Sequence, residues 1–356
     1  MRIWRKIIYT ILVFLIVFLS IEGSLRYVQG PLAPSVLVYS SVGNFTKWFD
    51  IRKGFARPVY KVNARNFPVQ SSKSRMAFLG GSTVHGGSPT VLLQQEFPNL
   101  VGKNLSKEVM NLARPSIDSH DILQIAEELI QFDFDHWVVY TGHNDFGNAY
   151  FFQRYKTWNA GVEAKTRSWL SSLHMYNFLQ KTISPVNSLQ RSLGWENFHG
   201  DAVTLRQRDL ITKHLKENIK RINWLGERNG VTVTFILPVA SATMRPLGNC
   251  SKVMPLCSHD IHRKALRLET INPKRARELF LDAWEYDTIP LRIPHSVQRE
   301  LQEFFEENEL SYVNMSDLVP KDQKLDLPDD SFFHDHVHFS KSGHQFVAEQ
   351  LTKHFR

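Results

Sequence analysis

Short apolar stretches alternate with amphipathic stretches along the chain from residue 75 onward. Five apolar runs predict strands at Arg75–Leu79, Glu108–Ala113, His136–Thr141, Val231–Leu237 and Leu310–Met315. Helical spacing of apolar positions predicts helices at Thr90–Leu105, Asp118–Gln131, Thr204–Asn229, Ser296–Asn308 and Ser342–His354. Because strands that alternate with helices are joined by right-handed crossovers, the pattern predicts an α/β fold with about five parallel strands flanked by helices.

Two inserts interrupt this alternation. Residues 146–202 are rich in aromatic side chains, and they predict either a lid or substrate wall above the sheet or extra packing over the core. Residues 240–290 carry both cysteines and many basic residues, and we expect them above the same edge of the sheet. Residues 27–74, with four prolines, predict a juxtamembrane linker and an irregular lead-in, so the folded domain is expected to span 75–356.

The N-terminus has the pattern of a membrane-targeting segment. Arg2, Arg5 and Lys6 precede an uncharged apolar run, Ile7–Ile21. No small-residue cleavage site follows, so an uncleaved signal anchor, a transmembrane helix over residues 1–26, is favoured over a removed signal peptide. The positive-inside rule then places the N-terminus in the cytoplasm and the rest of the chain, after about Arg26, outside it.

Composition excludes some functions and is compatible with that location. The 356 residues are 42% hydrophobic, which is ordinary for a globular protein. The net charge of +8 is spread along the chain without a Lys/Arg block or a recognisable nucleic-acid module, so no nucleic-acid partner is predicted. Cys250 and Cys257 could form a disulfide in an oxidising compartment or stay unpaired, and they are a weak metal signal.

A candidate nucleophile lies at the end of the first predicted strand. The segment Phe78–Gly87, FLGGSTVHGG, predicts a strand, a tight turn and a helix that begins near Ser88, with Ser82 in the turn. Parallel sheets bind ligands at the carboxyl ends of their strands. A phosphate-binding loop would need lysine where Gly87 stands, and the nucleophile elbow of α/β-hydrolases would need glycine in place of Val84.

A candidate base follows the fifth predicted strand. Asp335 and His338 are three residues apart, so the carboxylate could orient one imidazole nitrogen while the other faces the site. The alternative is a metal site, because His334, His336 and His338 alternate as they would on one face of a strand. A loop is expected here instead, so the acid–base pair is favoured, and neither a metal nor a cofactor is predicted.

Asn144 is the candidate stabiliser of a reaction intermediate. It follows the third predicted strand in the sequence Thr141–Asp145, TGHND. An asparagine amide aimed into the site can donate to the oxyanion of a tetrahedral intermediate, whereas a simple Gly-Asn turn is the alternative. Asp145 could compete with Asp335 as the acid, but adjacent residues on a turn generally point apart.

These motifs together resemble the ordered blocks of the SGNH/GDSL hydrolase superfamily. The blocks are Gly81-Ser82, Asn111, Gly142-x-Asn144 and Asp335-x-x-His338. The chain is also similar to the bacterial membrane-anchored branch, at Glu22–Arg26, Tyr140–Asn144, Pro290–Pro294 and His336–His338. The resemblance implies a three-layer, flavodoxin-like fold and places the anchored domain in the periplasm, attached to the inner membrane by a single span.

The resemblance also implies a role for each matching residue. Ser82 would be the nucleophile, His338 the general base and then acid, and Asp335 the residue that orients it. Asn144 and the backbone N–H of Ser82 would form the oxyanion hole. The family normally has a glycine N–H in its second block, which is absent here, so the backbone N–H of Ala113 or Ser116 is the candidate third donor.

The function predicted from this resemblance is a serine esterase that removes acyl groups, such as acetyl, from a polysaccharide or another cell-surface glycan. Aromatic residues of the first insert suit stacking on sugar rings, and the basic surface suits an acidic polymer. Two alternatives remain. An O-acyltransferase would pass the acyl group to a sugar hydroxyl, and a non-catalytic glycan-binding or assembly protein would retain the fold alone.

Overall fold

A computed structural model covers all 356 residues. It describes residues 38–40, 43–45, 48–52, 54–58, 66–86, 95–105, 107–151 and 202–356, and isolated positions between 9 and 24. The chain divides into two compact units. One comprises Met1–Tyr39, Gly43–Lys47 and Thr157–His199, and the other comprises Ser40–Val42, Trp48–Lys156 and Gly200–Arg356.

Two predictions fall largely on residues outside this description. Most of the anchor predicted over residues 1–26 is among them, as are residues 152–201 of the aromatic insert. Within the described part of the chain, no helix combines the length and the apolar character that a membrane span requires.

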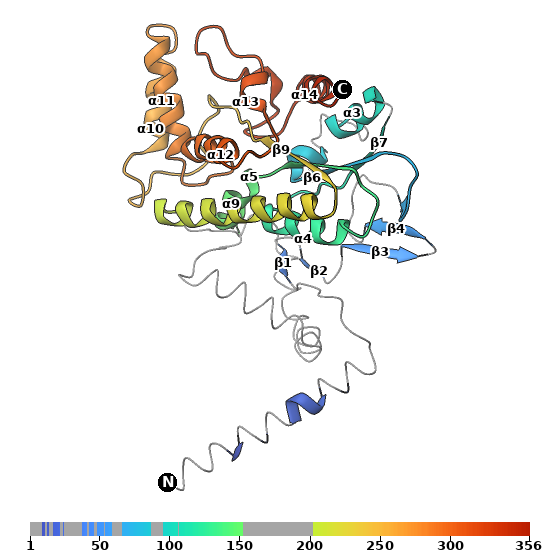
Figure 1. Cartoon of the computed structure of the whole chain (residues 1–356). Helices are drawn as coiled ribbons and strands as arrows, with labels where there is room; N and C mark the ends of the chain where they lie inside the picture. The colour runs from blue at the N-terminus through green and yellow to red at the C-terminus, as the bar shows by residue number, and fades with distance from the viewer. Residues whose placement is uncertain are drawn as a thin grey trace. The chain divides into compact units, whose positions relative to one another are not determined.

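The second unit is built on a five-stranded parallel sheet (Figure 1). Its strands are β6 (Arg75–Gly80), β7 (Glu108–Asn111), β8 (His136–Tyr140), β9 (Thr232–Leu237) and β10 (Tyr312–Asn314). Their order in the sheet is β10-β9-β8-β6-β7, and every pair is parallel. The predicted parallel α/β sheet is confirmed, and with the strands taken in chain order this is the 2-1-3-4-5 order of flavodoxin-like folds.

Helices cover both faces of this sheet. The elements that follow the strands are α2 (Ser82–His85), α3 (Phe97–Leu105), α4 (Ser119–Leu129), α5 (His143–Phe151), α9 (Leu205–Arg228), α12 (His295–Glu307), α13 (Met315–Leu318), η2 (Asp330–Phe332) and α14 (Lys341–His354). Helix α4 packs against α9 and helix α3 packs against α14, and Figure 1 shows these two pairs on opposite sides of the sheet. The core between them is apolar, and every residue of β6 is buried.

Local sequence explains where several of these helices begin. Asp118 accepts N–H bonds from His120 and Asp121, and Asp121 accepts the N–H of Asp118, which forms a capping box at the predicted start of α4. Thr204 and Gln207 form the same arrangement before α9. These caps satisfy N–H groups that the first helical turn leaves without partners.

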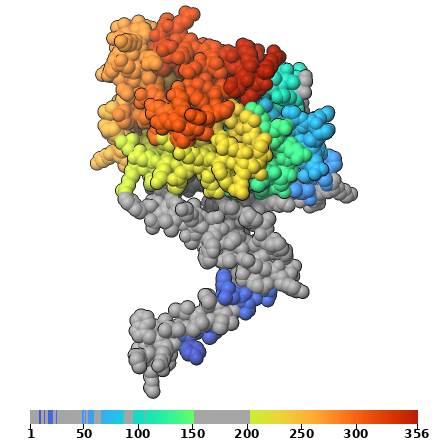
Figure 2. All heavy atoms as spheres, viewed as in Figure 1, coloured from blue at the N-terminus to red at the C-terminus, as the bar shows by residue number. Residues whose placement is uncertain are grey.

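The insert at 240–290 contains a helical hairpin that the sequence pattern did not predict. Helices α10 (Ser258–Leu268) and α11 (Pro273–Glu285) pack side by side, and Figure 1 shows them in orange. Their apolar faces share a core with residues near the C-terminus, including Leu325, Leu327 and Val337. In Figure 2 the atoms of the insert, in orange, lie next to those of the C-terminal residues, in red, on one face of the molecule.

Small strands precede the main sheet in the chain. Strands β1 (Val38–Ser40) and β2 (Gly43–Phe45) pair with each other, and β3 (Phe49–Arg52), β4 (Phe55–Pro58) and β5 (Phe67–Pro68) form a three-stranded sheet. The N–H groups of Trp48 and Phe49 donate to the carboxylate of Glu128 in α4, at 2.7 and 3.1 Å. From Trp48 onward the lead-in therefore contains regular structure that packs on the domain, where an irregular segment was predicted.

Candidate active site

Three polar side chains from distant parts of the sequence form one hydrogen-bonded chain. Ser82 follows β6, whereas Asp335 and His338 lie in the loop between η2 and α14. The distance from Ser82 Oγ to His338 Nε2 is 2.7 Å, and the distance from His338 Nδ1 to Asp335 Oδ2 is also 2.7 Å. The structure thus brings together the three residues predicted as nucleophile, base and orienting acid.

The Asp335 carboxylate is held in its ionised form. Burial alone would raise the pKa of this group, but the hydrogen bond and charge of His338 lower it, as do the backbone N–H groups of Val337 and His338. These two N–H groups donate to Asp335 Oδ1 at 3.0 and 2.9 Å, and the pKa lies well below its usual range. Because a carboxylate only accepts hydrogen bonds, His338 Nδ1 must carry a proton, and the Nε2 lone pair of a neutral ring is left to accept the proton of Ser82.

The predicted turn differs from the structure in one respect. Ser82 is the first residue of the short helix α2, so the helix begins at the serine rather than near Ser88. The N–H of His85 donates to the Gly81 carbonyl at 3.0 Å, which closes the first helical turn around the serine. The start of the helix predicted at Thr90 is outside the described residues, and α3 begins at Phe97.

Two glycines before Ser82 are required by close packing. A Cβ on Gly80 would lie 2.7 Å from the carbonyl oxygen of Tyr140 in the neighbouring strand. A Cβ on Gly81 would overlap the amide nitrogen of Asn144. The second glycine therefore allows the Asn144 amide to lie directly against the backbone that precedes the nucleophile.

The Asn144 amide, the predicted oxyanion donor, is held by a single hydrogen bond. Its Nδ2 donates to the carbonyl of Ile117 at 2.7 Å, which fixes the plane of the amide. No second acceptor for this amide is found within the described part of the chain, so its other N–H can donate to a ligand. The backbone N–H of Ser82 likewise has no acceptor among the described residues.

The predicted third donor needs a correction. The N–H of Ala113 donates to the Asn111 side chain at 3.2 Å, and the N–H of Arg114 donates to the Gly80 carbonyl at 3.0 Å. Both N–H groups therefore have acceptors within the fold. Asn111, at the end of β7, also donates to the Val84 carbonyl of α2, so it connects these two segments. Ser116, with a φ of 65°, stays a prediction.

The alternating histidines do not form a metal site in the described structure. The segment is a loop rather than a strand, and His334 is exposed to solvent. His336 Nε2 donates to the carbonyl of Arg245 at 2.7 Å, whereas His338 belongs to the hydrogen-bonded chain with Ser82. The three rings therefore serve different partners.

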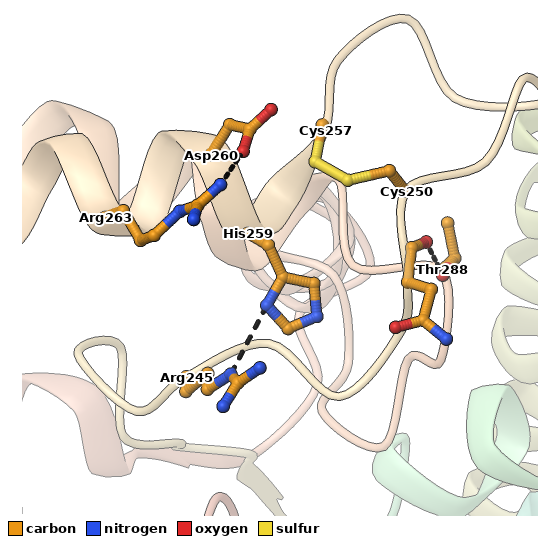
Figure 3. Close-up of a disulfide and its surroundings, with 8 residues drawn as sticks. Arg245, Cys250, Cys257, His259, Asp260, Arg263 and Thr288 are labelled. Atoms are coloured by element: carbon orange, nitrogen blue, oxygen red, sulfur yellow. Dashed lines mark hydrogen bonds and ion pairs between the residues drawn. A yellow bond between two sulfur atoms is a disulfide. The ribbon is translucent and has the colours of Figure 1, made fainter.

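The disulfide prediction is confirmed. Cys250 and Cys257 are bonded to each other, and Figure 3 shows the bond beside the start of α10. Their sulfurs and Asp260 are the one group of close potential metal ligands among the described residues. Both sulfurs are bonded to each other, so they are not available as thiolate ligands.

Of two buried residues near the site, Asp145 was weighed in the sequence as a rival acid, whereas no role was predicted for Arg292. Asp145 does not face His338, because its carboxylate accepts from the hydroxyls of Ser119 and Thr141. Burial, followed by the charge of Asp118, raises the pKa of Asp145 to about 7. The second residue, Arg292, lies in the run Pro290–Pro294, which was noticed only as part of the resemblance.

Comparisons with known proteins place the chain near esterase structures at low identity. No protein-family profile matches the chain. No curated protein matches it either. A member of the lipolytic protein G-D-S-L family from Veillonella parvula is 10% identical, with a TM-score of 0.42, over 79% of this chain and 98% of that one.

Two further solved structures are similar to a comparable degree. A carbohydrate acetylesterase family member from Sinorhizobium meliloti is 12% identical, with a TM-score of 0.38, over 80% of this chain and 97% of that one. The aryl esterase of M. smegmatis is 9% identical, with a TM-score of 0.39, over 80% of this chain and 98% of that one.

Proposed function

We propose that this protein is a serine ester hydrolase of the SGNH/GDSL type that acts through an acyl-enzyme. The observation that carries the proposal is the continuous chain from Ser82 Oγ through His338 to the Asp335 carboxylate, at 2.7 Å for each link. A serine hydroxyl is a weak nucleophile unless a base within hydrogen-bond reach removes its proton and a third group orients that base. All three groups are present at the carboxyl edge of the parallel sheet.

In the first half of the reaction, Ser82 Oγ bonds to the ester carbonyl carbon while its proton passes to His338 Nε2. The negative charge that develops on the carbonyl oxygen is stabilised by N–H donors from Asn144 and the Ser82 backbone. The Asp335 carboxylate stabilises the imidazolium that forms. Collapse of the intermediate breaks the bond to the alcohol oxygen, which takes the proton back from His338.

In the second half, a water molecule attacks the acyl-enzyme and His338 again acts as base and then as acid. The bond between Ser82 Oγ and the acyl carbon breaks, which releases the carboxylic acid and restores the hydroxyl. An O-acyltransferase would use a sugar hydroxyl in place of this water. Release of acetate in the absence of any added glycan supports hydrolysis, whereas acyl release that depends on a glycan acceptor supports transfer.

The substrate and location are parts of the same proposal. We infer an acylated cell-surface glycan as substrate, on the basis of the aromatic residues in 146–202 and the net charge of +8. The basic residues before Ile7–Ile21 and the Cys250–Cys257 disulfide support a chain held at the inner membrane with its domain in the periplasm. A fusion of alkaline phosphatase after residue 356 tests the location, because that reporter is active only outside the cytoplasm.

Covalent labelling tests the chemistry. Wild-type protein is expected to react with a fluorophosphonate probe at Ser82 and to hydrolyse p-nitrophenyl acetate, and Ser82→Ala is expected to do neither. A folded wild-type protein that takes up no label, and releases no nitrophenol above background, would support the non-catalytic binding protein instead.

A further inference from the structure

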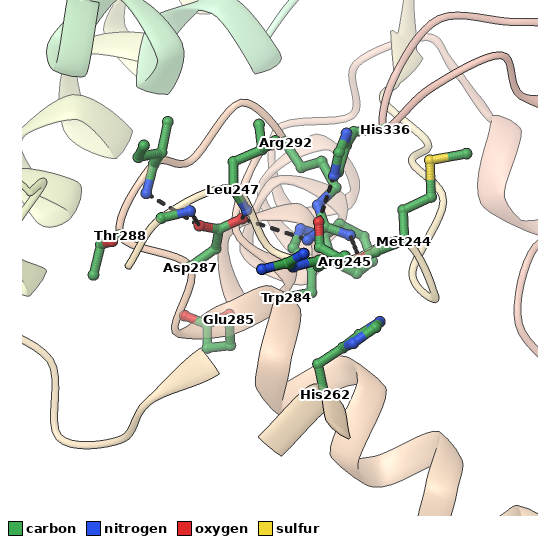
Figure 4. Close-up of polar contacts among 12 residues, drawn as sticks. Met244, Arg245, Leu247, His262, Trp284, Glu285, Asp287, Thr288, Arg292 and His336 are labelled. Atoms are coloured by element: carbon green, nitrogen blue, oxygen red, sulfur yellow. Dashed lines mark hydrogen bonds and ion pairs between the residues drawn. The ribbon is translucent and has the colours of Figure 1, made fainter. Parts of the chain in front are cut away.

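Arg292 is a fully buried cation near the loop of residues 333–340, which carries Asp335 and His338 and is called the acid–base loop below. Its side chain is 1% exposed, and its Nη2 lies 3.6 Å from Oδ2 of Asp287, whose side chain is 4% exposed (Figure 4). Burial lowers the pKa of Arg292 to about 10, partly offset by the charge of Asp287, so the guanidinium stays protonated at neutral pH. Because burying a charge costs free energy, such a guanidinium requires partners that compensate for its lost hydration.

Besides Asp287, the guanidinium of Arg292 has partners on one short segment, whose backbone carbonyls accept its N–H groups. Nη1 donates to the Ser241 carbonyl at 2.8 Å, with the Met244 carbonyl at 3.4 Å. This segment, 241–245, contacts the acid–base loop twice. The Ser241 N–H donates to the His336 carbonyl at 3.1 Å, and His336 Nε2 donates to the Arg245 carbonyl at 2.7 Å.

These two hydrogen bonds act next to the catalytic pair. His336 directly follows Asp335 in the chain and precedes His338 by two residues. A shift of 241–245 would therefore move the backbone that carries both groups. Among the described residues, Arg292 is one of two buried donors on that segment, because its guanidinium donates to the Ser241 carbonyl while His262 Nε2 donates to the Thr243 carbonyl at 2.7 Å.

The residue after Arg292 contacts the other half of the site. The Ile293 N–H donates to His143 Nδ1 at 3.1 Å, and its carbonyl accepts the indole N–H of Trp284 at 2.9 Å. Burial lowers the pKa of His143 to about 3, so this ring is neutral and its Nε2 proton is directed at the Val239 carbonyl, 3.2 Å away. His143 directly precedes Asn144, so the run 290–294 is attached both to the acid–base loop and to the oxyanion donor.

The counter-ion of Arg292 is itself fixed by the backbone. The Asp287 carboxylate accepts N–H bonds from Leu247, Gly248 and Ile289, at 3.0, 2.8 and 3.1 Å. A Cβ on Gly248 would lie 2.5 Å from the Ile289 nitrogen, so this cradle requires glycine. The ion pair is therefore held in one geometry from both sides.

Stability alone is a poor explanation for this pair. Replacing a buried ion pair by well-packed apolar residues is often neutral or even stabilising, because desolvation offsets the Coulomb attraction. An apolar side chain, however, could not donate to the Ser241 carbonyl. The contacts of Arg292 are thus suited to fixing a geometry rather than to adding free energy.

We propose that Arg292 is a positioning residue of the active site. Through residues 241–245 it fixes the position of the acid–base loop, and through Ile293 and His143 it aligns that loop with Asn144. This inference rests on the proposed serine-hydrolase function. It predicts that loss of Arg292 slows the chemical step more than it weakens substrate binding.

The test measures the rate of fluorophosphonate labelling at Ser82 together with the final labelled fraction. The fraction reports how much protein is folded and competent, and the rate constant reports how well Ser82 is activated in each competent molecule. Arg292→Met is expected to slow labelling by about 10- to 100-fold at a nearly complete final fraction, because small displacements of catalytic groups have effects of that order. Arg292→Lys is expected to recover part of the rate, since its ammonium can still donate to one carbonyl.

Hydrolysis of p-nitrophenyl acetate by the same variants should show a lower kcat with little change in KM. A matched control is Arg75, an equally buried arginine at the amino end of β6, which donates to the Pro68 carbonyl at 2.8 Å. Arg75→Met is expected to lower the Tm while leaving the labelling rate constant unchanged.

Two results would overturn the inference. Either Arg292→Met labels at the wild-type rate constant, or Arg292→Met and Arg75→Met both lose labelled fraction with no change in rate. If Arg292→Met does not fold, the rate constants of Arg292→Lys and Asp287→Asn decide, and wild-type rates in both exclude the role. A wild-type protein that does not label at all contradicts the proposed function, which is a different outcome.

Discussion

Ser82 and His338 meet within one hydrogen bond, but the backbones that carry them are held by different means. The serine follows Gly81 and the strand β6, whose residues are all buried, and it begins the helical turn α2, where the Gly86 N–H donates to the Ser82 carbonyl at 3.0 Å. The close packing of Gly81 against Asn144 completes its surroundings. Its position is therefore determined by the end of a central strand and by a few neighbouring residues.

The acid–base loop has local hydrogen bonds, such as that from the His334 N–H to the His338 carbonyl at 2.8 Å, but it also depends on distant segments. It is a loop with one isolated bridge, Phe333 to Phe339, and its backbone accepts hydrogen bonds from Ser241 and from the hydroxyl of Thr83, which donates to the Val337 carbonyl at 3.3 Å. The helical insert packs its apolar face beside Val337. The base is thus positioned by segments far away in the chain, which predicts that distant substitutions affect His338 more than Ser82.

The largest effect is expected from the two groups that meet. Ser82→Ala and His338→Ala should each lower kcat for p-nitrophenyl acetate by about 10⁴-fold or more, because the residues of such a triad act as a unit. His336→Ala serves as the control and should keep most of the activity, since the bond from Ser241 to the backbone of residue 336 remains. Equal losses in the variants of His334, His336 and His338 that added zinc restores would favour the metal site instead.

A smaller loss is expected when the nucleophile side is disturbed. Gly81→Ala introduces a Cβ that displaces the Asn144 amide, and losing one oxyanion donor typically lowers kcat by about 10²–10³-fold. Gly147→Ala is the matched control, because its Cβ would meet only Leu291 Cδ1 at 3.8 Å. Measuring kcat for p-nitrophenyl acetate in both variants checks this prediction. A wild-type kcat in Gly81→Ala would contradict the role of Asn144 as a donor.

On the insert side, the disulfide is expected to affect stability more than catalysis. Replacing Cys250 and Cys257 by serine removes a disulfide between residues with a sequence separation of 7. The loop-entropy relation predicts that this lowers the free energy of unfolding by about 2–3 kcal/mol. Denaturant unfolding of the double variant measures this. Dithiothreitol should lower the stability of the wild type but not that of the variant, and an equal response of both proteins would contradict the assignment.

The smallest effect is expected in the pH dependence of stability, from the buried carboxyl of Asp145, the residue after Asn144. The folded-state pKa of Asp145 is raised to about 7, above its ordinary value of 3.8. Between these values the folded protein binds more protons at this site than the unfolded chain, so the contribution of Asp145 to stability falls as pH rises from about 4 to 7. Asp145→Asn should flatten that slope in unfolding experiments, and an unchanged slope would show that the carboxyl titrates normally.

Much of this protein follows from local sequence. Alternating apolar runs predicted the five parallel strands, Asp118 and Thr204 predicted helix starts, and the motifs placed Ser82 and Asn144 shortly after strands. Such features depend on side-chain periodicity and on turns of a few residues. They are therefore readable without any long-range contact.

Tertiary structure alone decided the rest. The Ala113 N–H was a reasonable third donor until the fold directed it to Asn111. The hairpin α10–α11 and the Arg292 contacts were not foreseen either, because an arginine side chain usually lies in solvent. Periodicity in a sequence reports which side of an element is buried, whereas the partner of a buried polar group depends on which distant backbone the fold brings next to it.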